Sequence, residues 1–123
     1  MLNIRLKEPE LILDSTMVRY YGPYTAVLYA YILSYIKNNQ IPLNPDDNYP
    51  YHNFIVNRWE TLKAVGLTFG QQIDAEKDLI GAFLLDRFPR EENKVKYIVY
   101  PENIEMVRRD IYSRENGWDF SSE

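Results

Sequence analysis

Residues 57–82 carry the densest set of turn and capping signals in the chain, and these signals limit the folds that it can adopt. Asn57 is a plausible N-cap for the short helix RWETLKAV, which Gly66 closes. Thr68 opens a second helix at about 69–82, and Gln71, three residues later, completes a capping box. Only Val65-Gly66-Leu67-Thr68 separates the two helices, so the chain must change direction sharply between them. Gly66 permits the reversal and Leu67 can plug the junction, which predicts a helix-turn-helix.

The flanking segments place this motif in an α+β fold. Residues 51–57 look like a strand, with Tyr51, Asn53 and Ile55 facing one way and His52, Phe54 and Val56 the other. After the second helix, two apolar stretches at 83–88 and 95–100 flank the charged PREENK and predict a hairpin. The expected order is therefore strand, helix, helix and two-stranded hairpin.

A long helix precedes this unit. Pro23 begins the run PYTAVLYAYILSYIKNN, in which Tyr24, Leu28, Tyr31 and Tyr35 recur at helical spacing. Few positions of this run are polar, so we expect a helix that is buried on most sides and forms the hub of the core. A last helix follows Asn103, its expected cap, with a stripe formed by Ile104, Val107 and Ile111 and a Glu105–Arg109 pair. These two helices are the surfaces through which a homodimer would form.

We expect one domain over residues 1–123. It comprises an N-terminal arm of strands in 1–20, a core at 22–104, and a C-terminal helix and tail at 104–123. Two short strands are predicted in the arm, at Asn3–Lys7 and Leu11–Asp14.

Composition excludes several classes of protein. The 123 residues include no Cys and one His, which excludes disulfide scaffolds, Cys-ligated zinc and thiol nucleophiles. No apolar run reaches the ~18 residues of a membrane span, and the charged start is unlike a signal peptide, so a cytoplasmic location is expected. Enzyme motifs are absent. We therefore expect a binding protein with no catalytic residue, no cofactor, no metal and no small-molecule ligand. His52 is expected to pack on its strand, and Asp46-Asp47 to keep a proline-rich loop soluble.

The net charge of −4 requires any basic surface to be gathered on one face. The hairpin supplies Arg87, Arg90, Lys94 and Lys96, and the first helix of the pair supplies Arg58 and Lys63. From residue 87 to residue 109, six basic and four acidic residues give a mild positive excess. Such a hairpin has the dimensions to lie along a phosphate strand while a helix enters the major groove.

Three segments carry a family resemblance. They are GPYTAVLYAYILSYIKNN, IVNRWETLKAVGLTFGQQIDAEKDLIGAFLL and KVKYIVYPENI, within residues 22–104. This pattern resembles the winged-helix domain of plasmid and phage replication initiators of the RepA N-terminal type, and of DnaD-like primosome proteins. A narrower similarity is to the TraN-type accessory proteins of Gram-positive conjugative plasmids. The resemblance implies a winged helix-turn-helix that binds double-stranded DNA in a mobile element, acting as a transcriptional repressor or an accessory factor in conjugative transfer or replication.

If the resemblance holds, helix 69–82 meets the major groove. Base contacts would then come from Thr68, Gln71, Gln72 and Lys77, although Gln71 fits its capping role equally well. Ile73, Ala75, Leu79 and Ile80 bracket the expected buried arc of this helix. Asp74 and Asp78, expected on the outward face, and Glu91 and Glu92 at the hairpin tip would repel phosphates. They leave open a second interpretation, in which the domain is a protein–protein adaptor in a replisome or secretion assembly.

Overall fold

The computed structural model describes residues 11–46 and 48–115 and has an α+β fold, as the sequence predicts. The elements, in chain order, are α2 (Ser15–Tyr21), α3 (Pro23–Asn38), β1 (His52–Asn57), α4 (Arg58–Val65), α5 (Phe69–Gly81), β2 (Leu85–Pro89), β3 (Lys94–Val99), the 3-10 turn η1 (Pro101–Asn103) and α6 (Ile104–Glu115).

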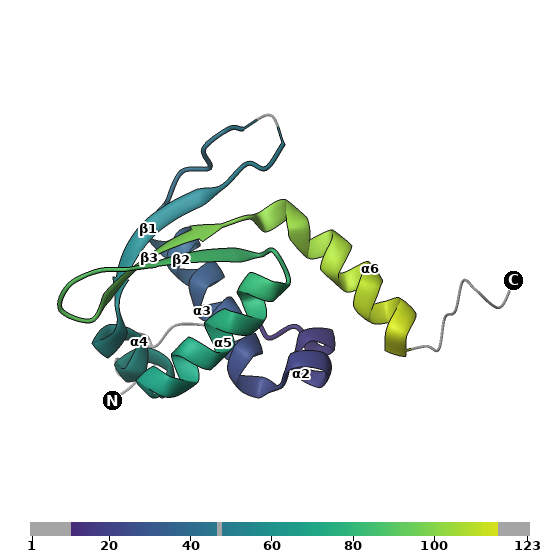
Figure 1. Cartoon of the computed structure of the whole chain (residues 1–123), viewed down its shortest axis with the longest axis horizontal. Helices are drawn as coiled ribbons and strands as arrows, with labels where there is room; N and C mark the ends of the chain where they lie inside the picture. Colours follow the sequence, from purple (N-terminus) through teal and green to yellow (C-terminus); the bar gives the residue numbers. More distant parts are fainter. Residues whose placement is uncertain (1–10, 47, 116–123) are drawn as a thin grey trace, which may run out of the picture.

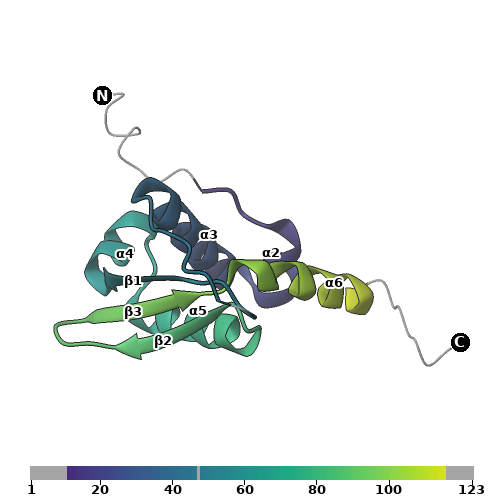
Figure 2. The same cartoon turned by 90° about the horizontal axis from the view of Figure 1, so that it is seen from above.

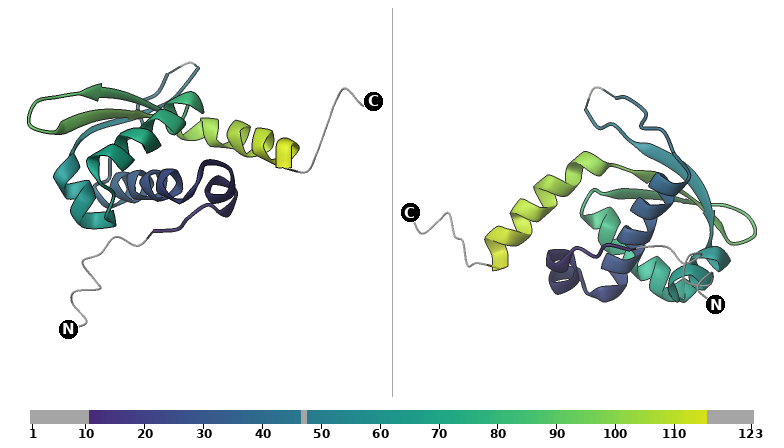
Figure 3. Two further views of the ribbon diagram at one scale, coloured as in Figure 1. Left: turned by 60° about the horizontal axis from the view of Figure 1, so that its bottom comes forward. Right: turned by 180° about the vertical axis from the view of Figure 1, so that it is seen from behind.

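The three strands form one antiparallel sheet in the order β1-β3-β2. Helices α3, α4 and α5 lie on one face of this sheet (Figures 1 and 3). Alternation along the strands sends Phe54, Val95, Tyr97 and Val99 into the space between sheet and helices, where all four are buried. The core therefore lies between a sheet and a helical layer.

Helix α3 is the centre of that core, as predicted. Leu28 and Ile32 are fully buried, and Tyr31 is buried as well. Tyr35 stacks on Phe54 of β1, with 5.0 Å between the ring centroids. Tyr24, predicted on the same stripe, is exposed. Most of the tyrosine-rich face therefore packs within the chain.

Local signals set the ends of α4 and α5 at the expected residues. The side chain of Asn57 accepts a hydrogen bond from the Trp59 N–H, and Gly66 ends α4 in the left-handed conformation at φ +78°. Thr68 and Gln71 form the reciprocal capping box at the start of α5. Leu67 is buried in the turn. These predictions are confirmed.

The N-terminal part differs from expectation. Residues 11–14 are irregular and are not a strand, and Ser15–Tyr21 is a helix that the sequence reading missed. Asp14 caps this helix by accepting hydrogen bonds from the N–H groups of Thr16 and Met17. The capping geometry favours a helix there, and Met17 anchors it in the core. The predicted strand at Asn3–Lys7 lies outside the described residues.

Helix α6 leads away from the sheet and runs beside α2 (Figure 2). Its predicted stripe is confirmed, since Val107 and Ile111 are buried. Two details were wrong. Glu105 pairs with Arg108 rather than Arg109, and the Asn103 side chain donates to the Phe83 carbonyl at 2.6 Å instead of capping α6.

None of the helices in the described part of the chain has the length and apolarity that crossing a bilayer requires. Within residues 11–46 and 48–115, no three His, Cys, Asp or Glu side chains are grouped so as to hold a metal ion.

Candidate nucleic-acid interface

The start of α4, the start of α5 and the β2–β3 turn lie together at one end of the molecule, which we call the hairpin end (Figure 1). The Arg58 N–H at the start of α4 donates to the Asn93 carbonyl of the turn at 2.9 Å. The rings of Trp59 on α4 and Phe69 on α5 are 4.8 Å apart between centroids. These contacts fix the two helix N-termini beside the turn, so all three elements can meet one ligand.

Thr68 and Gln71 lie at the N-terminus of α5. Thr68 is exposed, and its hydroxyl accepts a hydrogen bond from the Gln71 N–H at 3.1 Å. Gln71 is half-buried, and its Oε1 accepts from the Thr68 N–H at 2.9 Å. The capping role of Gln71 is thus satisfied in the free protein. The Gln71 side-chain nitrogen takes no part in the capping box, so it can donate a hydrogen bond to a ligand.

Five of the predicted basic residues are accessible, four of them at or near the hairpin end and Lys77 farther along α5, where it borders a pocket with Tyr20 and Arg114. Lys63, Lys77, Arg90 and Lys94 are exposed, and Lys96 is half-buried on the outer face of the sheet. Four acidic residues are exposed among them: Glu60, Asp74, Glu91 and Glu92. The hairpin end therefore carries mixed charge, with its four accessible basic side chains matched in number by the four acidic ones.

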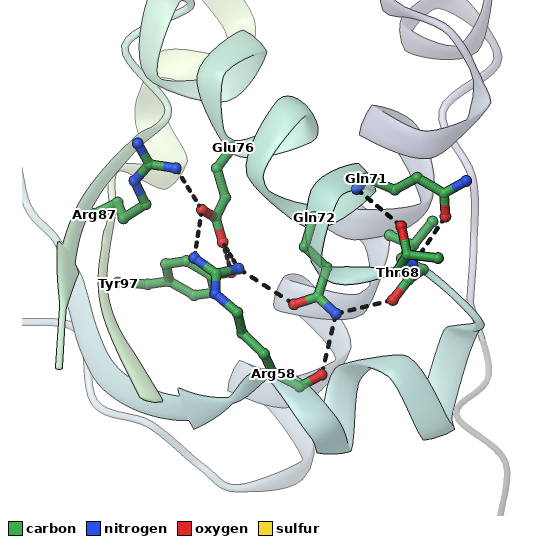
Figure 4. A network of polar contacts seen from close by, with 8 residues as sticks. Arg58, Thr68, Gln71, Gln72, Glu76, Arg87 and Tyr97 are labelled. Atoms are coloured by element: carbon green, nitrogen blue, oxygen red, sulfur yellow. Dashed lines mark hydrogen bonds and ion pairs between the residues drawn. The ribbon is translucent and has the colours of Figure 1, made fainter. Parts of the chain in front are cut away.

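Arg58 and Gln72, predicted as DNA contacts, are both buried, so their expected accessibility is wrong. The Arg58 guanidinium donates two hydrogen bonds to Glu76, at 2.8 and 3.0 Å, and a longer one to Gln72 Oε1 (Figure 4). The amide of Gln72 donates to the carbonyls of Arg58 and Leu67, at 3.1 and 2.9 Å. Both side chains therefore hold α4 against α5 and are not presented to solvent.

Arg87 also departs from the prediction that it contacts phosphate. It alternates with Asp86 and Phe88 along β2, so it faces the helical layer beside the inward-facing Tyr97 of β3. Its guanidinium pairs with Glu76 Oε1 at 2.9 Å, and three-quarters of the side chain is shielded from solvent. Its charge is engaged within the fold.

Glu76 is the centre of this network, and sequence reasoning missed it. Its carboxylate is fully buried and binds Arg58, Arg87 and the hydroxyl of Tyr97. Burial, together with the charge of Glu76 and its hydrogen bond, raises the pKa of Tyr97. Burial alone would lower the pKa of Arg58, but the hydrogen bond and charge of Glu76 raise it. The network thus joins α4, α5 and the hairpin.

The two aspartates of α5 differ in accessibility. Asp74 is exposed, as predicted. Asp78 was expected to point outward, but it is half-buried and accepts a hydrogen bond from the Thr25 hydroxyl of α3 at 2.7 Å. Asp78 therefore fastens α5 to α3, and Asp74 is the aspartate of this helix that is fully accessible.

An aromatic pair at the hairpin end was also missed. Trp59 is 53% exposed beside Phe69, at the start of α4 and α5 respectively. Trp59 lies two residues after the Asn57 cap, and Phe69 lies one residue after the Thr68 cap. An aromatic residue in the first turn of both helices was the sequence signal that could have revealed the pair. The pair adds an apolar contact area next to Thr68.

The other residues singled out from the sequence lie elsewhere. His52 lies on β1 with its ring Nδ1 3.0 Å from the Pro42 carbonyl. Asp46 accepts hydrogen bonds from the N–H groups of Asn48 and Tyr49, as expected of a loop residue. Asp47 lies outside the described residues.

We compared the chain with known proteins and found no relative. No family model, no curated protein and no solved structure matches the chain.

Proposed function

We propose that this chain is a winged helix-turn-helix protein that binds double-stranded DNA. The observation that carries the proposal is the joining of the N-terminus of α5 to the β2–β3 turn at one end, through α4. A helix whose N-terminus projects beside a hairpin can enter the major groove while the hairpin follows a neighbouring phosphate strand. The element order, β1-α4-α5-β2-β3 after a long helix, is the order expected of that domain class.

Under this proposal, phosphate contacts come from Lys63, Arg90, Lys94 and Lys96. Base contacts come from Thr68, from the amide nitrogen of Gln71 and from Lys77 at the start and outer face of α5. The resemblance of the sequence to plasmid and phage initiators supports a role in a mobile element, in repression, transfer or replication.

The test is a fluorescence-anisotropy titration of the full chain against random-sequence duplex DNA. The variant R90E/K94E should weaken binding at least several-fold, because two phosphate contacts become repulsions. The matched control R109E/R114E makes the same change in net charge on α6, away from the hairpin end, and should bind like the wild type. Equal losses in both variants would attribute the effect to net charge and contradict the assignment of the interface.

A second candidate is a protein–protein adaptor that uses the same end. The exposed Trp59 beside Phe69, together with Asp74, Glu91 and Glu92, favours it, since aromatic side chains are enriched in protein interfaces. This function predicts negligible DNA affinity at about 0.15 M salt. In that case Trp59→Ala should weaken capture of the protein partner while R90E/K94E leaves it intact.

A further inference from the structure

A pocket of about 480 Å³ lies at the other end of β2, away from the hairpin turn. The end of α5, the start of β2, the start of α6 and the loop before β1 border it. The residues that line it include Tyr49, Phe83, Asp86, Tyr100, Asn103 and Met106. Its size lies within the range of about 300–1,000 Å³ that is typical of small-ligand sites. None of these residues belongs to the proposed DNA interface.

The walls of this pocket are aromatic. The rings of Tyr49 and Tyr100 meet nearly at right angles, at 76°, with 6.4 Å between their centroids. Phe83 and Met106 also line the pocket and are exposed. Faces of tyrosine and phenylalanine rings carry negative electrostatic potential and attract cations.

A carboxylate lies among these walls. Asp86 accepts a hydrogen bond from the Tyr100 hydroxyl at 2.6 Å through Oδ2, which leaves Oδ1 outside that bond. Burial and the contact with Asp86 raise the pKa of Tyr100 to about 12, so this hydroxyl remains protonated at neutral pH. The Asp46 carboxylate also acts electrostatically on Tyr100. The pocket thus combines neutral aromatic walls with negative charge.

Phe83 adopts a conformation that its residue type does not favour. It follows α5 at φ +61°, where its N–H binds the Ile80 carbonyl and the Leu84 N–H binds the Leu79 carbonyl, both at 3.0 Å. This is a Schellman ending, in which glycine is the usual residue at the left-handed position. The side chain of Phe83 is nevertheless 69% exposed, so its ring gains little from packing. Fold stability does not explain a phenylalanine here, and strained residues of this kind cluster at ligand sites.

We propose that this pocket binds an organic cation, an alkylammonium or guanidinium group, between the rings of Tyr49, Tyr100 and Phe83 and against the Asp86 carboxylate. The rings supply cation–π attraction and shelter the apolar part of the guest, while Asp86 supplies a charge-assisted partner. Asn103 holds Phe83 in place, since its amide donates to the Phe83 carbonyl. A free amine and a Lys or Arg side chain of another protein share this chemistry.

The experiment is an NMR titration of the full, ¹⁵N-labelled chain. The probes are choline, its uncharged isostere 3,3-dimethylbutan-1-ol, and N-acetylarginine amide. Choline or the arginine amide should shift the amides of Phe83, Leu85 and Asp86 with a Kd in the millimolar range, as expected of such small guests. The uncharged isostere should bind roughly ten-fold more weakly, because cation–π and ion pairing contribute about 1–2 kcal/mol.

Three variants place the site. Phe83→Gly and Asp86→Asn should each weaken choline binding several-fold, and Phe83→Gly relieves the backbone strain, so misfolding cannot account for its loss of binding. Phe88→Ala is the matched control, since it removes another exposed ring of β2 that lies outside the pocket, near the hairpin turn.

A short arginine- or lysine-containing peptide that binds at least ten-fold tighter than choline would identify a protein side chain as the guest; the reverse order would identify a free amine. The proposal is overturned if no probe shifts the pocket amides at about 50 mM, if choline and its isostere bind alike, or if both pocket variants bind like the wild type. None of these outcomes depends on DNA binding.

Discussion

At the scale of single residues, Phe83 makes a prediction about stability. A side chain with a Cβ costs roughly 1 kcal/mol in the left-handed region where Phe83 lies, and its exposed ring repays little of this. We therefore expect Phe83→Gly to raise the free energy of unfolding by about 1 kcal/mol, measured by urea denaturation. Phe83→Ala, which keeps the strain and removes the ring, should remain near the wild type. A loss of stability in Phe83→Gly would show that the ring packs more than its exposure indicates.

Tyr97 makes a prediction about alkaline pH. Its folded-state pKa is raised above the ordinary 10.0, and burial raises that of Tyr29 to about 12. As the pH rises through 10, the unfolded chain releases these protons while the folded chain retains them, so the stability present below pH 10 is progressively lost. The free energy of unfolding, measured between about pH 8 and 11.5, should fall above about pH 10.

Tyr97→Phe tests the source of this pH dependence. It should flatten the alkaline fall, and at neutral pH it should cost about 1–2 kcal/mol, because Glu76 loses a donor. The exposed Tyr24→Phe is the control and should change neither quantity. If the free energy of unfolding of Tyr97→Phe falls as steeply above about pH 10 as that of the wild type, groups other than Tyr97 cause the fall.

At the scale of elements, the buried Glu76 fixes α5 against α4 and the hairpin. Glu76→Ala leaves the buried Arg58 and the largely shielded Arg87 without their counter-charge, and we expect it to lower the free energy of unfolding by about 3–5 kcal/mol. Asp74→Ala, on the exposed face of the same helix, should change it by less than about 0.5 kcal/mol. Chemical denaturation of the two variants provides the comparison. Similar small effects in both would mean that the network does not stabilise the fold.

The elements that sequence predicted well are those with local signals at their ends. Pro23, Asn57, Gly66 and the Thr68–Gln71 capping box each act within a few residues, so their effect is readable from a short stretch. Helix α2 was missed although its cap is local too, because seven residues without a long apolar stripe give a weak helical pattern, and part of its support is distant. Its cap, Asp14, also pairs with Arg108 of α6 at 3.0 Å, a contact across 94 residues.

The candidate site was only partly predictable, for a related reason. Gln72, Ala75, Glu76 and Leu79 follow helical spacing and form one buried arc, but Gln72 and Glu76 are polar residue types usually found at the surface. Their burial requires Arg58, Arg87 and Tyr97 from three other elements. Only the assembled fold supplies those partners. The exposed lysines needed no partner, and their accessibility followed from position alone.

At the scale of the whole molecule, the two ends of β2 have different chemistry. The hairpin end has Lys63, Arg90 and Lys94 exposed around two helix N-termini. The other end has the aromatic pocket with Asp86. Under the two proposals, a chain of net charge −4 presents a surface for an anionic polymer at one end and a site for a cation at the other. The two sites can be occupied together, since they share no residue.

The salt dependence of DNA binding tests how many cations the fold leaves accessible. Arg58 and Arg87 are both held by Glu76 within the fold, so five predicted cations remain accessible: Lys63, Lys77, Arg90, Lys94 and Lys96. At about 0.9 per phosphate contact, the plot of log K against log salt should have a slope no steeper than about −4.5. It should be near −2.7 or shallower in R90E/K94E. Anisotropy titrations across a salt series measure both slopes. A wild-type slope near −6 would mean that cations beyond these five contact phosphate, either Arg58 and Arg87 released from Glu76 or basic residues elsewhere in the chain such as Arg109.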